Sequence, residues 1–442
     1  MPTLLALGEA ALARRFTDWL LALQRPDGGF PSVRSDGGSL IGTAHAIGAL
    51  LAWQEANHGM ERLAAERAAA WLARRIDAAG RFDVSDCPPT SIDRWAAPAI
   101  HVACLPPLRQ ASIKLREPVW QNAVQRAAHH LRRSLDWACL PHAAHLAAAA
   151  AGAWIELGEQ ELAREIVLGY GNFERHNPPR SPICNAALAH FAEIWYRLAE
   201  RRLADRALAC LQSRQLPTGA FPARDSRALR GSTSRESAWA CKHFLDASLA
   251  RVQTSFEQYG ADLPDRIEPT DGRFRAVHAW RRSLGPAATI ADVGCGSGRF
   301  LRELAPRFPA ARWIAIDPSP RALEQCREWA ECRPGGLLRI PAGDAELDGA
   351  MAIESLEHSL LPERAVGELC RVVRPGGRIV VIDKHRAKQR LSQHEPWERW
   401  FWPETVSAWL ARDCREVVAR PIAHGAALQP DGLFWCWEAT RS

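Results

Sequence analysis

The residues best suited to chemistry are an acid and three glycines in the segment Asp292-Val-Gly-Cys-Gly-Ser-Gly298. An apolar run, 288–291, precedes the segment and a helical pattern, 299–305, follows it, which predicts a strand, a glycine turn and a helix. Glycine lets a ligand lie against bare backbone, and amide groups at the start of a helix attract negatively charged groups. We therefore predict a ligand-binding turn at residues 292–298.

A second acidic position supports this prediction. The apolar stretch 313–316 predicts another strand, and Asp317 stands at its end, about twenty residues past the glycines. A carboxylate at that position is placed to accept hydrogen bonds from the two hydroxyls of a ribose. The turn lacks the spacing of the G-x-G-x-x-G type, so it differs from the usual dinucleotide-binding turn.

Three further segments complete the pattern. They are Ala342-Gly-Asp-Ala345, Met351-Ala-Ile-Glu-Ser-Leu-Glu-His358 and Val373-Arg-Pro-Gly-Gly-Arg-Ile-Val-Val-Ile-Asp383. With the glycine turn and Asp317, they resemble the class I S-adenosylmethionine-dependent methyltransferases over about residues 265–442. The resemblance implies a Rossmann-like, seven-stranded α/β sheet with S-adenosyl-L-methionine as its cofactor.

The resemblance also implies a role for each matching residue. The three glycines of the turn would approach the methionine and ribose portions, Asp317 would bind the ribose hydroxyls, and Asp344 with Ala345 would face the adenine. The full set of expected cofactor-binding residues is Asp292, Gly294, Gly296, Gly298, Asp317, Asp344, Ala345 and Glu354. For Asp344 the alternative is an aspartate that only caps a turn.

The acceptor side depends on groups able to take a proton from a hydroxyl. The candidates are His358, Asp383, His394 and Glu395, which follow the predicted fourth and fifth strands. The last two lie in a segment, 392–402, that is rich in aromatic and ionisable residues and that suits a lid over the acceptor. The alternative is an amphipathic helix that packs against the rest of the chain.

Length and composition set the broad class. The chain has 442 residues, 47% of them hydrophobic and 24% charged, which predicts a globular protein of two domains. The net charge of +6 is spread through the sequence, so we expect no nucleic-acid partner. We see neither a membrane-length apolar run nor a signal peptide, and we expect a cytoplasmic location. The 12 cysteines have no metal-ligand spacing, and we expect no metal.

The N-terminal half predicts helices in pairs. Small-residue helices are expected at 43–53, 95–104, 143–155, 183–198 and 235–249, and more polar helices lie between them, for example 60–76 and 200–212. Glycine–phenylalanine turns recur at 26–30, 79–82, 170–173 and 217–221. Residues 10–250 thereby resemble the α/α toroid of the terpene cyclase and protein prenyltransferase superfamily. The acid motifs of the cyclases are missing, so the resemblance implies architecture only.

Each of the small-residue helices carries one histidine. These are His45, His101, His145, His190 and His243, with Asp93, Arg235, Glu236 and Trp239 on or near the same helices. If they point into one cavity, they form a polar pocket for a hydroxylated or anionic ligand, or even a metal site. The alternative is that each histidine only satisfies hydrogen bonds where helices pack.

The sequence thus predicts a multidomain α and α/β protein. Its parts are an α/α toroid over residues 1–250, a linker over 251–272 and a methyltransferase domain over 273–442. We expect methylation of a hydroxyl on a glycan or natural product, with the toroid binding or orienting this acceptor. The alternatives are a bifunctional enzyme whose toroid has its own isoprenoid or glycan chemistry, and a scaffold that binds the cofactor without catalysis.

Overall fold

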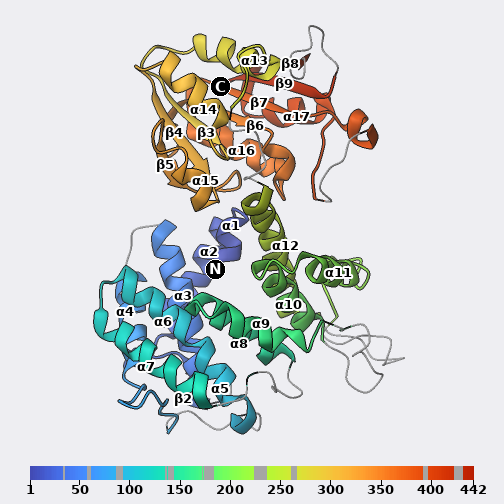
Figure 1. Cartoon of the computed structure of the whole chain (residues 1–442). Coiled ribbons are helices and arrows are strands. Elements are labelled where there is room, and N and C mark those ends of the chain that lie inside the picture. Colours follow the sequence, from blue (N-terminus) through green and yellow to red (C-terminus); the bar gives the residue numbers. More distant parts are fainter. Residues whose placement is uncertain are drawn as a thin grey trace. The chain divides into compact units, whose positions relative to one another are not determined.

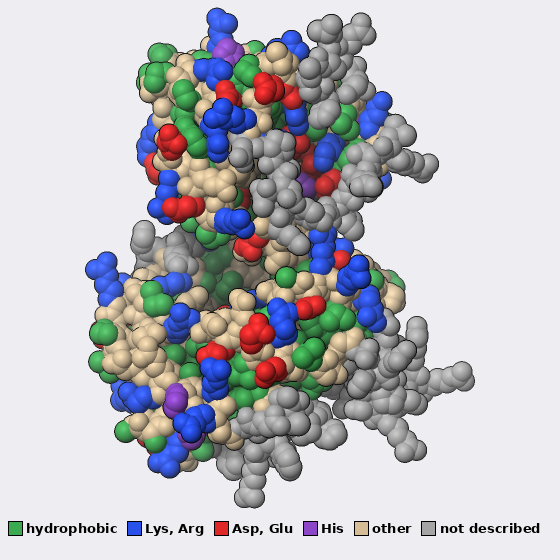
Figure 2. Space-filling view, viewed as in Figure 1, with side chains coloured by type: hydrophobic (Ala, Val, Ile, Leu, Met, Phe, Trp, Pro, Cys, Tyr) green, Lys and Arg blue, Asp and Glu red, His purple; other side chains and the backbone are tan. Residues whose placement is uncertain are grey.

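The structure, a computed structural model, describes residues 1–32, 35–56, 61–85, 93–134, 137, 144–171, 173, 184–222, 236–259, 266–391, 397–422 and 432–442. Its contacts divide the chain into two compact units (Figure 1). The helical unit comprises Met1–Leu5 and Glu9–Arg251, and the sheet unit comprises Ala6–Gly8 and Val252–Ser442. On the face seen in Figure 2, basic and acidic side chains are interspersed over the described parts of both units.

The helical unit is built from helices of 5 to 22 residues. Its elements are α1 (Pro2–Ala6), α2 (Ala10–Leu23), α3 (Leu40–Ala56), α4 (Glu61–Ala73), α5 (Asp93–Ala103), α6 (Leu105–Lys114), α7 (Pro118–Ser134), α8 (Ala144–Leu157), α9 (Gln160–Leu168), α10 (Asn185–Arg197), α11 (Arg201–Gln212) and α12 (Ala238–Tyr259), with a short strand pair β1 (Pro31–Ser32) and β2 (Ser35–Gly38). In α7 the buried residues Trp120, Ala123, Ala127 and Leu131 recur at spacings of three and four, so one face of the helix packs inward. The sequence analysis missed α6 and α9 as separate helices.

Two sets of helices differ in composition. The alanine-rich α8 buries residues on several sides, including Ala147, Ala148, Ala151 and Trp154, whereas α11 buries one face only. Helix α3 packs against α5, α5 against α8, and α8 against α10. The His190 ring on α10 stacks on His243 of α12 with ring centroids 4.0 Å apart, and Trp239 of α12 lies 6.1 Å from His45 of α3. The chain of contacts therefore returns to the helix where it began.

Glycines in two turns of this unit let the chain pass close to the backbone of a later helix, α4 for Gly28 and α7 for Gly80. Gly28 (φ +97°) and Gly80 (φ +82°) have a backbone conformation that other residues rarely adopt. A Cβ atom on Gly28 would lie 2.6 Å from the Arg67 carbonyl oxygen, and one on Gly80 would lie 2.3 Å from that of Arg126. These two turns thus need glycine for packing.

The sheet unit contains a seven-stranded sheet in the order β5-β4-β3-β6-β7-β9-β8. The strands are β3 (Thr289–Val293), β4 (Arg312–Asp317), β5 (Glu331–Pro334), β6 (Leu347–Ile353), β7 (Val373–Lys384), β8 (Cys414–Ile422) and β9 (Phe434–Arg441). Strands β3 to β7 are parallel to one another, and β9 is antiparallel to both β7 and β8. The order reverses between β3 and β6, where open sheets of this kind bind ligands beyond the carboxyl ends of the strands.

Helices cover both faces of this sheet. They are α13 (Gly272–Arg282), α14 (Arg299–Leu304), α15 (Pro320–Glu324), α16 (Pro362–Val372) and α17 (Pro403–Leu410), with 3₁₀ turns η3 (Ala305–Arg307), η4 (Leu356–His358) and η5 (Arg386–Leu391). Because side chains alternate along a strand, Ile290 packs with Trp280 of α13 on one face, while Ala291 packs with Leu369 of α16 on the other. None of the helices in the described ranges is long and apolar enough to span a membrane.

One predicted strand was wrong. The apolar run 337–341, Leu-Leu-Arg-Ile-Pro, predicts the third strand of the sheet, but the third strand is β5, where Glu331 pairs with Ile314 and Pro334 with Asp317. An edge strand has a neighbouring strand on one side and solvent on the other, so the polar sequence Glu-Cys-Arg-Pro suits this position. The predicted linker, 251–272, begins inside α12 and ends at the first residue of α13.

Candidate functional site

The glycine turn leads from the carboxyl end of β3 into α14. Gly294, Gly296 and Gly298 all have positive φ values, of 81°, 53° and 79°. A Cβ atom on Gly294 would lie 2.5 Å from the Ser355 Cβ, and one on Gly298 would lie 2.8 Å from the Cys326 sulfur. A Cβ atom on Gly296 would meet nothing within 4 Å. The outer glycines are therefore packed, while the middle one faces open space that a ligand can fill.

Asp317 at the end of β4 fixes this turn. Its Oδ2 accepts a hydrogen bond from the Gly296 amide at 3.0 Å, and its Oδ1 accepts one from the Ser319 amide at 2.9 Å. Burial raises the pKa of Asp317, although these two amide bonds oppose the shift. A carboxylate oxygen can accept more than one hydrogen bond, so Asp317 keeps capacity for a ribose hydroxyl.

Asp292 lies beneath the turn on β3. Its side chain is buried, and burial together with the nearby Asp317 raises its pKa to about 7. Arg299, the first residue of α14, opposes this shift. A positively charged ligand group at the turn would favour the ionised form of Asp292.

Glu354 follows β6 in a left-handed conformation (φ 51°), and its amide donates to the Ile382 carbonyl oxygen at 2.7 Å. Its carboxylate pairs with Arg273 at 2.6 Å and with Arg299. Although burial opposes ionisation, the two arginines hold the pKa of Glu354 below its ordinary value. Arg273 also forms a two-pronged pair with Asp271 at 2.8 Å, so it links α13 to the edge of the sheet.

Asp344 and Ala345 stand in a turn before β6. The Asp344 side chain is 82% exposed and pairs with Arg371 at 2.8 Å, and Ala345 has a φ of 55°. The structure places this turn at the start of β6, and Asp344 is the least buried of the predicted cofactor residues.

A buried acidic cluster lies at the carboxyl ends of β6 and β7. It consists of Glu357, Asp383, Lys384 and Glu398. Lys384 Nζ lies 2.8 Å from Glu357 Oε1 and 3.4 Å from Glu398 Oε2, and the Glu357 amide donates to Asp383 Oδ2 at 3.2 Å. Burial raises the pKa of Asp383 to about 7, and burial together with Asp383 raises the pKa of Glu357 well above its ordinary value. Glu357 Oε2 is buried and has no hydrogen-bond partner among the described residues.

His358 stands next to this cluster. Its Nε2 lies 3.5 Å from Glu357 Oε1, and the Phe256 ring packs edge-on against it at 4.6 Å. Burial lowers the pKa of His358 to about 4, so the ring is neutral at pH 7. A neutral imidazole accepts a proton, but its low pKa makes Glu357 the stronger base here.

The predicted acceptor-side residues are thus only partly brought together. His358 and Asp383 belong to one cluster, in which Asp383 is fully buried and supports the Glu357 amide. His394 and Glu395 lie outside the described residues. The sequence analysis did not single out Glu357, Lys384, Glu398 or Arg273. The available signal for Glu357 was an acid beside His358 at the end of a strand.

The histidines of the helical unit form no single set. His45, His190 and His243 join α3, α10 and α12 through ring contacts with one another or with Trp239. His101 instead stacks on Phe82 at 4.6 Å. Glu236 accepts a hydrogen bond from Thr218 at 2.7 Å, and Arg235 lies outside the described residues. Burial lowers the pKa of His45 to about 4 and that of His190 well below its ordinary value.

Comparisons with known proteins agree with the topology and the glycine turn. Residues 291–381 match the family model of the methyltransferase domain. The C-terminal region is a class I S-adenosylmethionine-dependent methyltransferase domain. S-adenosylmethionine is therefore the cofactor that its glycine turn would hold, and we call the sheet unit the methyltransferase unit from here on.

Two curated relatives match part of the chain. An O-methyltransferase of Penicillium expansum is 37% identical over 112 residues, which are 23% of this chain and 40% of that protein. A trans-aconitate 2-methyltransferase of Azoarcus is 34% identical over 153 residues, which are 32% of this chain and 55% of that protein. The chain thus spans about half or less of the length of these relatives. A solved methyltransferase structure from Aquifex aeolicus is 19% identical, with a TM-score of 0.34, and the match covers 43% of this chain and 98% of that one.

Proposed function

We propose that the protein transfers the methyl group of S-adenosylmethionine to a hydroxyl oxygen of a glycan or natural product. The observation that carries this proposal is the buried acidic cluster beside the glycine turn. Ser355 touches Gly294 directly, and its hydroxyl donates to the Val293 carbonyl oxygen at 2.9 Å, so the segment after β6 lies against the cofactor turn. Glu357 is two residues further along this segment.

In the proposed site the cofactor is held by the carboxyl ends of β3 and β4. The Gly296 backbone would lie against it, Asp317 would bind the ribose hydroxyls, and ionised Asp292 would attract its ammonium group. Gly294 and Gly298 shape the turn, and Glu354 orients it through Arg299. Asp344 and Ala345 precede the amino end of β6 and contact Arg371 at the end of α16, at the opposite edge of the sheet, so they are not part of this proposed site. When bound, the cofactor supplies a methyl group that is already activated by its sulfonium charge.

The protein's own contribution is alignment and removal of a proton. Glu357 would accept the hydroxyl proton at Oε2, the oxygen that lacks a partner. Asp383 raises the proton affinity of Glu357, and Lys384 holds Oε1 in place. His358 is the alternative base, with His394 and Glu395 as further candidates from the proposed lid.

The helical unit would bind or orient the acceptor. The return of its helix contacts from α12 to α3 supports the proposed toroid, and the exposed rings of His45, His145 and Trp239 are suited to a polar ligand. The domain limits proposed are 1–250 and 273–442.

The test uses wild type, Asp317→Ala and Glu357→Gln. Calorimetric titration with S-adenosylhomocysteine should give micromolar affinity for wild type and Glu357→Gln and a loss of at least about 100-fold, or about 2.7 kcal/mol, for Asp317→Ala. Release of S-adenosylhomocysteine with a panel of hydroxylated acceptors should fall by about 100-fold or more in Glu357→Gln. Equal turnover of wild type and Glu357→Gln would reject Glu357 as the base. If wild type binds no cofactor, the proposed methyl transfer is rejected.

A further inference from the structure

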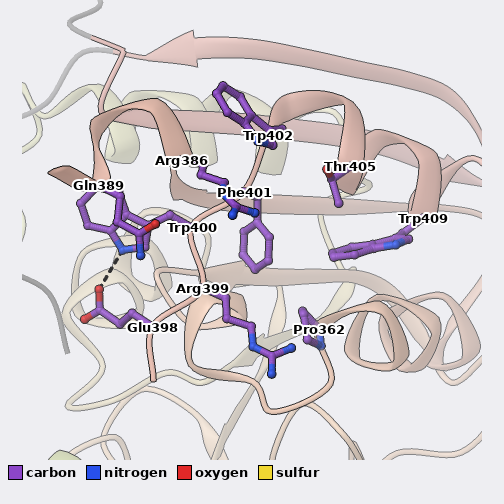
Figure 3. Close-up of a pocket in the computed structure, with 10 residues that line it drawn as sticks. All are labelled: Pro362, Arg386, Gln389, Glu398, Arg399, Trp400, Phe401, Trp402, Thr405 and Trp409. Carbon is purple, nitrogen blue, oxygen red and sulfur yellow. Dashed lines mark hydrogen bonds between the residues drawn. The ribbon is translucent and has the colours of Figure 1, made fainter. Parts of the chain in front are cut away.

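A groove of about 350 Å³ adjoins the acidic cluster of the methyltransferase unit (Figure 3). Its walls come from the start of α16, from η5, from residues 398–402 and from α17. The volume is within the range of small-molecule sites. Phe401 ties the groove to the sheet, because its amide donates to the Lys384 carbonyl oxygen at 3.1 Å and its carbonyl oxygen accepts from the Arg386 amide at 2.9 Å.

Aromatic side chains form one part of the lining. Trp400 and Phe401 are almost fully buried, Trp409 packs edge-on against Phe401 at 5.8 Å, and Trp402 is 46% exposed. Trp400 is fixed, since its Nε1 donates to Glu398 Oε2 at 2.8 Å and Lys384 Nζ lies 5.3 Å from its ring centroid. Such a lining suits a flat ring that stacks on the indoles.

Two guanidinium groups form the other part. Arg386 and Arg399 are exposed and line the groove, and neither side chain has a hydrogen bond or ion pair with another residue in the described part of the chain. Some other exposed arginines of this unit are paired, for example Arg412 with Glu363 and Arg374 with Asp348 at 2.6 Å. The one acid in the lining, Glu398, is already engaged by Trp400 and Lys384. The groove therefore offers positive charge that no described acid neutralises.

The groove is connected to the proposed base. The Arg399 amide donates to the Glu357 carbonyl oxygen at 2.9 Å, and Lys384 bridges Glu398 and Glu357. The wall of the groove is thus bonded directly to the segment that carries Glu357.

We propose that this groove binds an acceptor that combines an aromatic ring with an anionic oxygen acid, a carboxylate or a phosphate. The indoles hold the ring, and Arg386 and Arg399 bind the anion, for which a guanidinium is well matched in geometry and charge. The inference rests on the proposed methyl transfer and narrows its acceptor to aromatic acids that carry a hydroxyl.

The test is calorimetric titration of the full-length protein after saturation with S-adenosylhomocysteine. The probes are 4-hydroxybenzoate, phenyl phosphate and, as the neutral control, 4-hydroxybenzyl alcohol. We expect at least one anion to bind at least about tenfold more tightly than the alcohol, since hydrogen bonds between charged groups are stronger than those to a neutral hydroxyl. The tighter of the two anions identifies the acid group, and its affinity should fall as salt is added.

The double substitution Arg386→Gln with Arg399→Gln should remove this preference, whereas Arg412→Gln, as the matched control, should keep it. The proposal is overturned if the alcohol binds as tightly as both anions, if no anion binds, or if the double variant binds like wild type. Calorimetry with S-adenosylhomocysteine on the same samples separates the two proposals. If the cofactor binds but no anion does, only the proposal for the groove is rejected. If the cofactor does not bind, the proposed methyl transfer is rejected as well.

Discussion

The glycines of the helical unit and those of the methyltransferase unit face different surroundings. Gly28 and Gly80 bring their turns against the backbone of α4 and α7, and a Cβ atom on either would collide with a carbonyl oxygen. Gly296 has a positive φ as well, but a Cβ atom there would meet open space, and its amide bonds to Asp317. Gly296 therefore leaves room for a ligand beside Asp317, whereas Gly28 and Gly80 serve packing.

The largest expected effect concerns a packing glycine. Gly80→Ala should lower the free energy of unfolding of the helical unit by about 3 kcal/mol, because the new methyl group collides with Arg126 and the backbone is strained. Gly158→Ala, where the φ is +95° but no atom lies within 4 Å, should cost only about 1 kcal/mol. Urea unfolding followed by circular dichroism measures both. If Gly80→Ala also lost cofactor affinity, the distinction between packing glycines and the cofactor-facing glycine would be contradicted.

A second effect of about 3 kcal/mol is expected from a buried ion pair in the methyltransferase unit. Arg273→Ala leaves Asp271 without its partner and Glu354 with Arg299 alone, so unfolding should require about 3 kcal/mol less. Arg412→Ala breaks an exposed pair with Glu363 and should cost less than about 1 kcal/mol. Equal effects of the two substitutions in urea unfolding would contradict the role given to Arg273.

The two units should respond to acid in opposite directions. The pKa values of His45 and His190 are lowered, so the unfolded helical unit binds protons that the folded unit does not, and its stability falls as the pH drops below about 6.5. The pKa values of Asp292 and Asp383 are raised to about 7, so the folded methyltransferase unit binds more protons, and its stability rises as the pH falls from about 7 towards 4. His358 opposes this second trend.

Calorimetry at pH 7.5 and pH 5.5 measures this difference. Added S-adenosylhomocysteine identifies the transition of the methyltransferase unit, because a ligand stabilises the unit that binds it. Asp292→Asn should reduce the pH response of that transition and leave the other unchanged. If both unfolding transitions shift to lower temperature at pH 5.5, the opposite pH responses assigned to the two units are contradicted.

The smallest expected effect on stability concerns a glycine that neither packs against a backbone nor faces the proposed cofactor. Gly367 is exposed in α16, its φ is ordinary, and a Cβ atom would meet nothing within 4 Å. Gly367→Ala should raise the free energy of unfolding by about 0.5–1 kcal/mol, because alanine favours a helix, and should leave cofactor affinity unchanged. Thermal unfolding would detect the shift, and a destabilised variant would show that this position has an unrecognised contact.

Much of the methyltransferase unit could be predicted from local signals. Buried parallel strands such as β3 and β4 are continuous apolar runs, and the glycine turn between β3 and α14 has a distinct spacing. The edge strand β5 could not be found this way, because Glu331–Pro334 lacks an apolar pattern. Its place is set by pairing with β4, which no local sequence pattern reveals.

The candidate site was predictable in part for a similar reason. Asp292, Asp317 and the glycines follow strands that end at the same edge. Arg273 is 81 positions from Glu354 in the sequence, and only the folded chain brings the two together. Glu357 stood beside His358 in a quoted segment, but its importance comes from burial and from Asp383, which only the structure shows.

Calorimetric titration of wild type and Gly296→Asn with S-adenosylhomocysteine tests the central claim most directly. Asparagine adopts a positive φ more readily than other non-glycine residues, so the variant should lose only about 1 kcal/mol of stability, while its side chain fills the space proposed for the cofactor. We predict micromolar affinity for wild type and a loss of at least about 100-fold for the variant. Equal affinities would contradict a cofactor at Gly296, and a wild type that does not bind would contradict the methyltransferase itself.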